Sequence, residues 1–250
     1  MIKNLVVNGA SGVDDRPHVT WATFLSKKYQ WDSYHNLGSA GCGNDYICDS
    51  TIQLLEKQQF DPKETLVIIM WSGVGRKDLA ITGEWYYHLK DSYGSLRNHN
   101  DEEYYLFSGG LTNAWEKNKT TKKIFEWLYK LSDPVTICVN SLLNFINLEN
   151  YLKVHGYNYK FTVDVNCWTP ANEGTEFYGD HSIGYFCADL PIYQNFDFSN
   201  WFFINDQKDG LGQFIKYEKT FTDTLHTSAP TYEKFAEQIV IPQIAHFMQA

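Results

Sequence analysis

The stretch TLVIIMW, from Thr65 to Trp71, is the most strand-like run in the sequence. It is apolar on both of the faces that a strand presents, which is typical of the middle of a parallel sheet covered by helices on both sides. The opening residues Ile2 to Val7 are also apolar and β-branched, and they end at Asn8-Gly9, a turn signal. These two runs predict a fold built on a parallel sheet.

Strand and helix patterns alternate on either side of these runs. Further strands are expected near 34–37 and 159–165. The alternation predicts a three-layer α/β/α fold with a flavodoxin-like parallel sheet of about five strands. We expect one domain over residues 1–250, with an aromatic-rich insertion or lid at about 73–130. The predicted helices are 20–29, one capped by Asn44 or Asp45, 121–131, one from Asp133-Pro134 to His155-Gly156, and 231–248 with a kink at Pro242.

The composition excludes several classes of protein. The 250 residues carry a formal net charge of -9, which argues against nucleic-acid binding, because phosphate contacts need Lys and Arg. No run reaches the roughly 18 to 20 apolar residues of a membrane span, and the short apolar start MIKNLVV predicts no signal peptide. Five cysteines without a CxxC pair indicate buried thiols in a reducing compartment. We therefore expect a cytoplasmic protein that binds neither nucleic acid nor membrane.

Three glycine-containing loops follow predicted strands, at 8–12, 38–44 and 72–76. In a doubly wound sheet, function gathers at the carboxyl ends of the strands. Ser11 lies between glycines in the first of these loops, where its hydroxyl would stand beside backbone N–H groups. A serine nucleophile needs a base, a group that orients the base, and donors for the oxyanion. An ordinary tight turn is the alternative interpretation, and phosphate binding is weak because neither GxGxxG nor GxxxxGK[ST] occurs.

A histidine three residues after an aspartate would supply both the base and its orienting group. The sequence contains this spacing three times, so the spacing alone does not choose among the pairs. The last pair lies in a short polar loop directly before the final predicted helix, whereas the other two lie near the first helix and the second strand. The pairs are Asp15/His18, Asp32/His35 and Asp223/His226.

Four segments in order resemble the SGNH (GDSL-type) hydrolase superfamily, in particular its divergent bacteriophage-encoded members. The resemblance covers nearly the whole chain. The four segments in the expected order are stronger evidence for it than any one segment alone. The segments are LVVNGAS at 5–11, NLGSAGCGNDYI at 36–47, VIIMWS at 67–72, and DTLH at 223–226 followed by KFAE at 234–237.

By this resemblance, Ser11 is the nucleophile, His226 the general base and Asp223 the residue that orients it. The backbone N–H groups of Ser11 and Gly41 are the implied oxyanion donors, and no metal or organic cofactor is required. Two departures stand out. The chain has Gly9-Ala10-Ser11 instead of Gly-Asp-Ser, and its third block lacks the asparagine that usually donates to the oxyanion. Either Ser72, a backbone amide or Asn44 replaces that donor, or the oxyanion hole is weakened.

The function that the resemblance implies is ester hydrolysis through an acyl-enzyme, with a small acyl group such as acetate on a carbohydrate as substrate. The proposed substrate contacts are Arg76, Trp71, Trp85 and Tyr86; Arg76 would bind a substrate carboxylate or pair with an acid such as Asp78. The alternative is a catalytically inactive carbohydrate-binding or structural protein, which would be a virion component if a phage encodes it. The sequence leaves the oligomeric state open.

Overall fold

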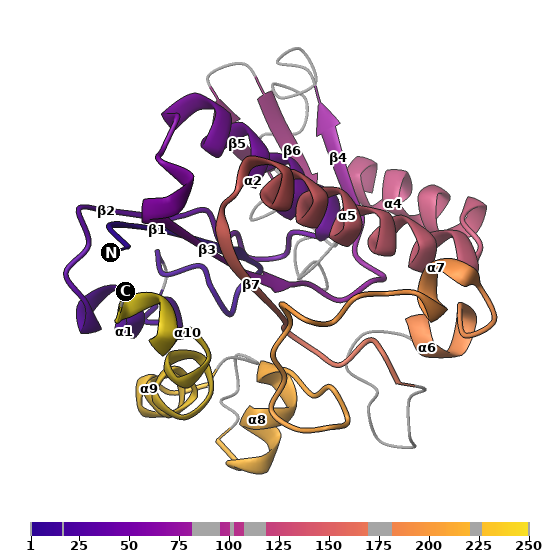
Figure 1. Cartoon of the computed structure of the whole chain (residues 1–250). Helices are drawn as coiled ribbons and strands as arrows, with labels where there is room; N and C mark the ends of the chain where they lie inside the picture. Colours follow the sequence, from indigo (N-terminus) through magenta and orange to yellow (C-terminus); the bar gives the residue numbers. More distant parts are fainter. Residues whose placement is uncertain are drawn as a thin grey trace.

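A parallel sheet of four strands forms the centre of the described chain (Figure 1). The computed structural model describes residues 2–16, 18–81, 96–100, 103–107, 119–169, 182–220 and 227–249. The strand order is β2-β1-β3-β7, and every neighbouring pair is parallel. The strands are β1 (Asn4–Gly9), β2 (Ser33–Asn36), β3 (Thr65–Trp71) and β7 (Asn158–Val163).

The central strand β3 is buried along its whole length, as its apolar sequence predicts. Its side chains alternate between two cores. Leu66, Ile68 and Met70 pack into one apolar cluster, and the side chains between them pack into the other. Each fully buried aliphatic side chain stabilises the fold by about 1.5–3 kcal/mol. The strand is therefore the shared wall of two cores.

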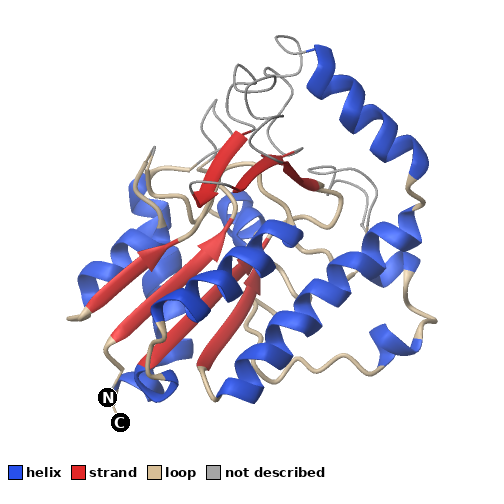
Figure 2. Ribbon diagram, turned by 90° about the horizontal axis from the view of Figure 1, so that it is seen from above, coloured by secondary structure: helices blue, strands red, loops and turns tan. Residues whose placement is uncertain are grey.

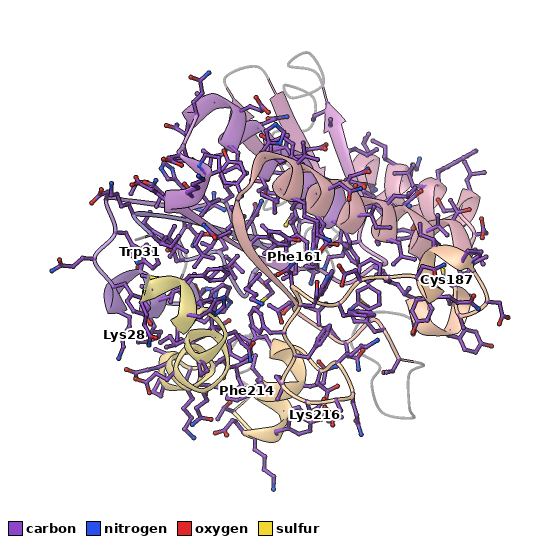
Figure 3. The ribbon with its side chains drawn as sticks, in the orientation of Figure 1. Lys28, Trp31, Phe161, Cys187, Phe214 and Lys216 are labelled. Carbon is purple, nitrogen blue, oxygen red and sulfur yellow. The ribbon has the colours of Figure 1, made fainter. Side chains whose placement is uncertain are left out.

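Helices cover both faces of the sheet, which gives the three layers expected from the sequence (Figures 1 and 2). One face carries α2 (Asn44–Gln58) and α5 (Pro134–His155). The opposite face carries α1 (Trp21–Lys28), α8 (Leu211–Tyr217), α9 (Ala229–Phe235) and α10 (Ile241–Met248). In Figure 3, Phe161 lies inside the first of these two cores and Phe214 inside the second.

The sheet has four strands in the described chain, one fewer than the expected number of about five. The next position beside β7 is occupied by a single parallel bridge between Phe161 and Trp201. There the Phe161 N–H donates to the Asn200 carbonyl at 2.9 Å, and the Phe202 N–H donates to the Phe161 carbonyl at 2.8 Å. The segment around Trp201 thus lies along β7 without becoming a strand.

The expected insertion at 73–130 contains a second sheet, which the sequence did not predict. This sheet is antiparallel in the order β4-β6-β5, and Figure 2 shows it beyond the carboxyl ends of the parallel strands. The predicted helix at 121–131 is confirmed as α4. The bounds are β4 (Asp78–Ile81), β5 (Leu96–Asn100), β6 (Glu103–Phe107) and α4 (Lys119–Leu131).

The ends of two helices follow from local sequence. Asp133 caps α5 by accepting a hydrogen bond from the Thr136 N–H at 3.1 Å, and Gly156 ends the helix at a φ of 78°. The final helix is interrupted, as Pro242 predicts: a π-helical turn, η3 (Ala236–Val240), separates α9 from α10. The remaining short elements are η1 (Pro62–Glu64), α6 (Ile183–Phe186) and α7 (Pro191–Gln194).

All five cysteines are buried and carry free thiols, as expected. Among the helices of the described residues, none combines the length and the apolar character needed to cross a bilayer.

Candidate active site

The topology places a switch point between β1 and β3. The chain leaves β1 for β2 on one side of the sheet, and later strands are added on the other side. Crevices at the carboxyl ends of strands beside such a point are the usual ligand sites of open α/β sheets. Ser11 lies two residues after β1, and the loop 72–76 follows β3 directly. Both predicted segments therefore flank the switch point.

The loops after β1 and β2 are joined at the last residue of β1. The Gly9 carbonyl accepts hydrogen bonds from the Ser39 N–H at 2.9 Å and from the Cys42 thiol at 3.4 Å. Gly9 itself allows the β3 backbone to come very close, because a Cβ at this position would lie 2.6 Å from the Met70 carbonyl oxygen. This contact fixes the start of the loop that carries Ser11.

A buried carboxylate joins the same two loops on the far side of Ser11. Asp14 accepts a hydrogen bond from the Ala40 N–H at 3.0 Å, and Arg16 Nε donates to it at 2.7 Å. Burial raises the pKa of Asp14, but the hydrogen bonds from Arg16 and Ala40 outweigh it and hold the pKa below its usual value. Ser11 and Gly41 therefore lie in loops that are tied together on both sides.

Within the loop after β2, the backbone N–H of Gly41 differs from those of its neighbours in its hydrogen bonding. The other N–H groups of residues 38–43 donate to acceptors inside the protein, whereas the Gly41 N–H has none in the described part of the chain. Gly41 has a φ of 86°, a backbone conformation that favours glycine. The acceptors are Asn36 Oδ1 for Gly38, the Gly9 carbonyl for Ser39, Asp14 Oδ2 for Ala40, the Ser39 carbonyl for Cys42 and the Asp78 carboxylate for Gly43.

The loop after β1 shows the same pattern. The N–H groups of Val13 and Asp14 both donate to the Ala10 carbonyl, at 3.0 and 3.1 Å, which closes a tight turn. The N–H groups of Ser11 and Gly12 have no acceptor among the residues that the structure describes. Two neighbouring loops thus each keep a backbone donor that no described residue accepts from, at the residues expected to stabilise an oxyanion.

The first turn of α2 is capped by a residue from the second sheet. Gly43 is the N-cap, which corrects the expectation that Asn44 or Asp45 caps this helix. The Asp78 carboxylate accepts from the N–H groups of Gly43, at 2.8 Å, and Tyr46, at 2.9 Å. Burial raises the pKa of Asp78 to about 7, against these two hydrogen bonds, which lower it. Asp78 supplies the cap that no residue of the helix sequence provides.

Asn44 and Ser72 are the side chains expected to replace the missing asparagine. The Asn44 side chain binds the backbone of Ser72, and the Ser72 hydroxyl binds the loop just before Asn44. Asn44 Oδ1 accepts from the Ser72 N–H at 2.9 Å, and Asn44 Nδ2 donates to the Ser72 carbonyl at 3.3 Å and to Ser141 Oγ at 3.2 Å. Ser72 Oγ donates to the Cys42 carbonyl at 2.9 Å. Both side chains hold α2 against the end of β3, so we leave them out of the proposed oxyanion site.

Two further charged groups lie at this edge of the sheet. Arg76 is only 9% exposed, and its Nη1 donates to the Cys42 carbonyl at 3.4 Å. Asp164, directly after β7, is equally buried, and burial raises its pKa while the charge of Arg76 lowers it. Asp164 Oδ1 lies 3.5 Å from the point that a Cβ on Gly12 would occupy. Arg76 and Asp164 therefore belong to the same edge as Ser11.

Of the remaining predicted residues, the structure describes Trp71 alone. Trp71 is fully buried, and its ring packs 4.6 Å from that of Phe145, so it belongs to the core and we leave it out of the proposed site. Asp223, His226, Trp85 and Tyr86 lie outside the described residues.

The residues that flank the Asp223/His226 pair are described. Thr220 and Thr227 are joined by a hydrogen bond between their hydroxyls at 2.9 Å. Two residues later α9 begins, and its Tyr232 ring lies 6.0 Å from the ring of His18, in the segment between β1 and α1. Thr220 and Thr227, which precede and follow residues 221–226, therefore lie close together. They lie next to a helix whose Tyr232 packs beside His18, in the segment that follows Ser11.

The two other aspartate–histidine pairs have different surroundings. Asp15 accepts a hydrogen bond from the Tyr34 hydroxyl at 3.0 Å. His35 lies on the edge strand β2, where its ring packs 5.2 Å from Phe60 and burial lowers its pKa. These contacts give both pairs structural roles.

A cleft of about 700 Å³ opens beside the loop after β2, between β2 and α2. Polar side chains contribute much of its wall. Its lining residues include Arg16, Asn36, Gly38, Tyr46, Gln53 and Lys57. As for metal binding, the described residues contain no group of three or more His, Cys, Asp or Glu side chains placed to hold an ion.

Comparisons with known proteins give little further information. No protein-family model matches the chain, and no curated protein matches it. Among solved structures, the chain is similar to one described as the crystal structure of TesA, at 14% sequence identity and a TM-score of 0.47. The match covers 98% of this chain and 99% of that chain. The function proposed below therefore rests on the residues of this chain.

Sequence reasoning missed Asp14 and Asp164 at this edge, and it named Asp78 only as a partner for Arg76 and not as the cap of α2. A signal was available for Asp164, because it directly follows a predicted strand, where functional side chains gather. Asp14 lies three residues after Ser11. Its signal was its place as an acidic side chain in the loop after β1, where it can accept a hydrogen bond from the neighbouring loop after β2. Asp78 had no local signal, since its partners lie 35 and 32 residues away in the sequence.

Proposed function

We propose that this protein is a serine esterase that works through an acyl-enzyme. The observation that carries the proposal is that the N–H groups of Ser11 and Gly41 have no acceptor among the described residues, in two loops that hydrogen bonds tie together. Such donors, fixed before the reaction, are what the transition state of acyl transfer requires. The family resemblance supplies His226 as base and Asp223 as the residue that orients it.

The reaction follows from these roles. The Ser11 hydroxyl attacks the ester carbonyl while His226 takes its proton, and the carbonyl oxygen becomes an oxyanion held by the two N–H groups. Collapse of this intermediate breaks the ester bond, and His226 returns the proton to the departing alcohol. His226 then takes a proton from water as the water oxygen attacks the acyl-enzyme, and it returns this proton to Ser11 Oγ when the bond to the acyl group breaks and the acid is released. No step needs a metal or an organic cofactor.

The substrate that we propose is a small acyl group, such as acetate, on a carbohydrate. The chain is 16% aromatic, and such side chains stack on sugar rings. The cleft beside the loop after β2 adds polar side chains suited to hydroxyl groups, among them Gln53, Lys57 and Gln58.

Labelling with a fluorophosphonate probe, followed by intact mass measurement, tests the proposed nucleophile. We expect one adduct on the wild-type protein and none on Ser11→Ala or His226→Ala. Ser199→Ala, which removes a hydroxyl from an exposed segment, is the matched control and should label like the wild type. Acetate release from acetylated sugars then tests the substrate class. Absence of any adduct on the folded wild-type protein would refute the esterase proposal.

A second candidate function is a carbohydrate-binding or structural protein, of a phage particle for example, that has lost the reaction. It is favoured by the engagement of Ser72 and Asn44 inside the fold, which leaves the missing asparagine without a side-chain replacement from these two residues. Glycan-array binding by the wild-type protein that Ser11→Ala leaves unchanged, together with no fluorophosphonate adduct, would establish this function in place of the esterase.

A further inference from the structure

The loop after β3 carries a buried guanidinium in the block where the family resemblance leads one to expect an asparagine donor. Arg76 lies five residues after the end of β3 and is only 9% exposed. Charged side chains are rarely buried without a specific partner or a function, because removing them from water is costly. The burial of Arg76 therefore indicates that its guanidinium has a specific partner or function.

On one side, Arg76 packs on the residues that follow Gly41. Its Nη1 donates to the Cys42 carbonyl at 3.4 Å. Its backbone carbonyl oxygen lies 2.9 Å from the point that a Cβ on Gly43 would occupy, so no larger residue fits there without a shift. Both the side chain and the backbone of Arg76 are thus in contact with the loop that presents the Gly41 N–H.

On the other side, Arg76 interacts with a carboxylate that lies beside the Ser11 turn. The positive charge of Arg76 lowers the pKa of Asp164, although burial raises it more. Asp164 Oδ1 in turn lies 3.5 Å from the Cβ position of Gly12, the residue after Ser11. Arg76 therefore contacts the loop that presents the Gly41 N–H, and its charge acts on a carboxylate beside the turn that carries Ser11.

We propose that the Arg76 guanidinium is the third donor to the oxyanion, in place of the missing asparagine, and that Asp164 orients it. This inference rests on the esterase function proposed above. When Ser11 attacks, the electron pair of the carbonyl bond moves to oxygen, and an N–H of Arg76 binds that oxygen without losing its proton. Hydrogen bonds from a charged donor are roughly twice as strong as neutral ones. Arg76 thus acts on the reacting carbonyl rather than on a substrate carboxylate.

Variants at Arg76 test this role. In Arg76→Gln, kcat for hydrolysis of p-nitrophenyl acetate should fall by about 10²- to 10³-fold, the loss that follows removal of one oxyanion donor. KM should change by less than about threefold, because the donor acts mainly on the transition state. Lys3→Gln removes a positive charge that pairs with Glu64 at the start of β1, and this control should behave like the wild type.

Binding of a boronic acid separates a catalytic role from a structural one. A boronate forms a tetrahedral adduct with an active serine and so mimics the oxyanion intermediate. In Arg76→Gln the boronate affinity should fall by the same factor as kcat/KM, with Arg76→Lys intermediate between Gln and wild type. Loss of activity with unchanged boronate affinity, or activity within about threefold of the wild type, would overturn the proposal.

Asp164→Asn is a second variant that leaves the guanidinium in place, and it keeps the proposal testable if Arg76→Gln does not fold. It should lower kcat by about tenfold and weaken boronate binding in proportion, because Arg76 loses its orienting partner. Unchanged kcat in this variant would contradict the orienting role. Fluorophosphonate labelling of the wild type distinguishes failure of the esterase proposal from failure of the Arg76 proposal. No adduct on the wild type would refute the esterase function. A labelled wild type together with a fully active Arg76→Gln would refute only the role of Arg76 as third donor.

Discussion

The two loops that present the unused N–H groups are held in place in different ways. The turn after β1 is closed by its own backbone, with the N–H groups of Val13 and Asp14 bound to the Ala10 carbonyl. The loop after β2 is held by side chains from distant segments: Asp14 binds the Ala40 N–H, Asp78 binds the Gly43 N–H, and Ser72 and Arg76 bind the Cys42 carbonyl. The position of Ser11 is therefore set locally, and that of Gly41 by the tertiary structure.

This difference teaches that the two donors of the proposed oxyanion site have separate sensitivities. Substitutions of the side chains that hold the loop after β2 should move the Gly41 N–H while leaving the backbone turn of Ser11 intact. Such variants would keep a reactive hydroxyl but stabilise the oxyanion less well. The following predictions test that separation.

Asp14→Ala should give the largest loss of stability. The substitution leaves the Ala40 N–H and the Arg16 guanidinium without the carboxylate that binds them, and we expect a loss of about 2–3 kcal/mol, moderated because the Arg16 side chain is half exposed. Urea unfolding followed by circular dichroism measures it. The acylation rate with p-nitrophenyl acetate should fall in the same variant, since the Ala40–Gly41 backbone loses its anchor. A change below about 0.5 kcal/mol would show that Asp14 does not hold the two loops together.

Asp78→Asn should change the pH dependence of stability. The pKa of Asp78 is raised to about 7 in the folded protein from an ordinary value near 3.8, so the folded state binds this proton more tightly than the unfolded state. Its contribution to stability is therefore greatest below the unfolded pKa and is lost as pH rises through about 7. The wild type should lose about 1–2 kcal/mol relative to Asp78→Asn between pH 5.5 and pH 8.

Urea midpoints of both proteins, measured at half-unit steps of pH, give the difference curve directly, because other titrating groups cancel in the subtraction. A flat difference curve would mean that the pKa of Asp78 is not raised into this pH range and that the cap of α2 carries its negative charge throughout it.

Asn36→Ala should give the smallest effect. Asn36 Nδ2 donates to the Val13 carbonyl at 2.8 Å, and its Oδ1 accepts from the Gly38 N–H at 2.8 Å, so this one side chain links the ends of both loops. We expect a loss of about 1 kcal/mol in urea unfolding. Ser33→Ala is the matched control on the same strand, where the hydroxyl bonds only to Asn4 Oδ1, and it should cost less. Equal losses in the two variants would show that linking the loops adds nothing.

The features that the sequence predicted are those with a local cause. The strand β3 follows from an unbroken apolar run, and the start of α5 follows from Asp133, whose acceptor oxygen binds an N–H three residues away. The π-helical turn before Pro242 is likewise a consequence of the residues around it. The loops with Ser11 and Gly41 could be placed because each follows a recognisable strand.

The features that the sequence did not predict depend on contacts between distant segments. The second sheet pairs strands rich in polar and aromatic residues, which carry no clear alternation. The helix α2 is capped by Asp78, which only the folded chain brings to Gly43. The contact of Arg76 with Cys42 joins the loops after β3 and β2. Its interaction with Asp164 requires β3 to lie beside β7, a neighbour relation that no sequence pattern specifies.

The single bridge at Trp201 has a consequence for how this protein behaves at high concentration. Open sheet edges offer backbone groups to a strand of a second molecule and so promote aggregation. Here one edge is the four-residue strand β2, with the polar sequence SYHN, and the other edge is covered where Asn200 and Phe202 bond to Phe161. A short polar strand at one border and a covering segment at the other both disfavour pairing of this sheet with a strand of a second molecule.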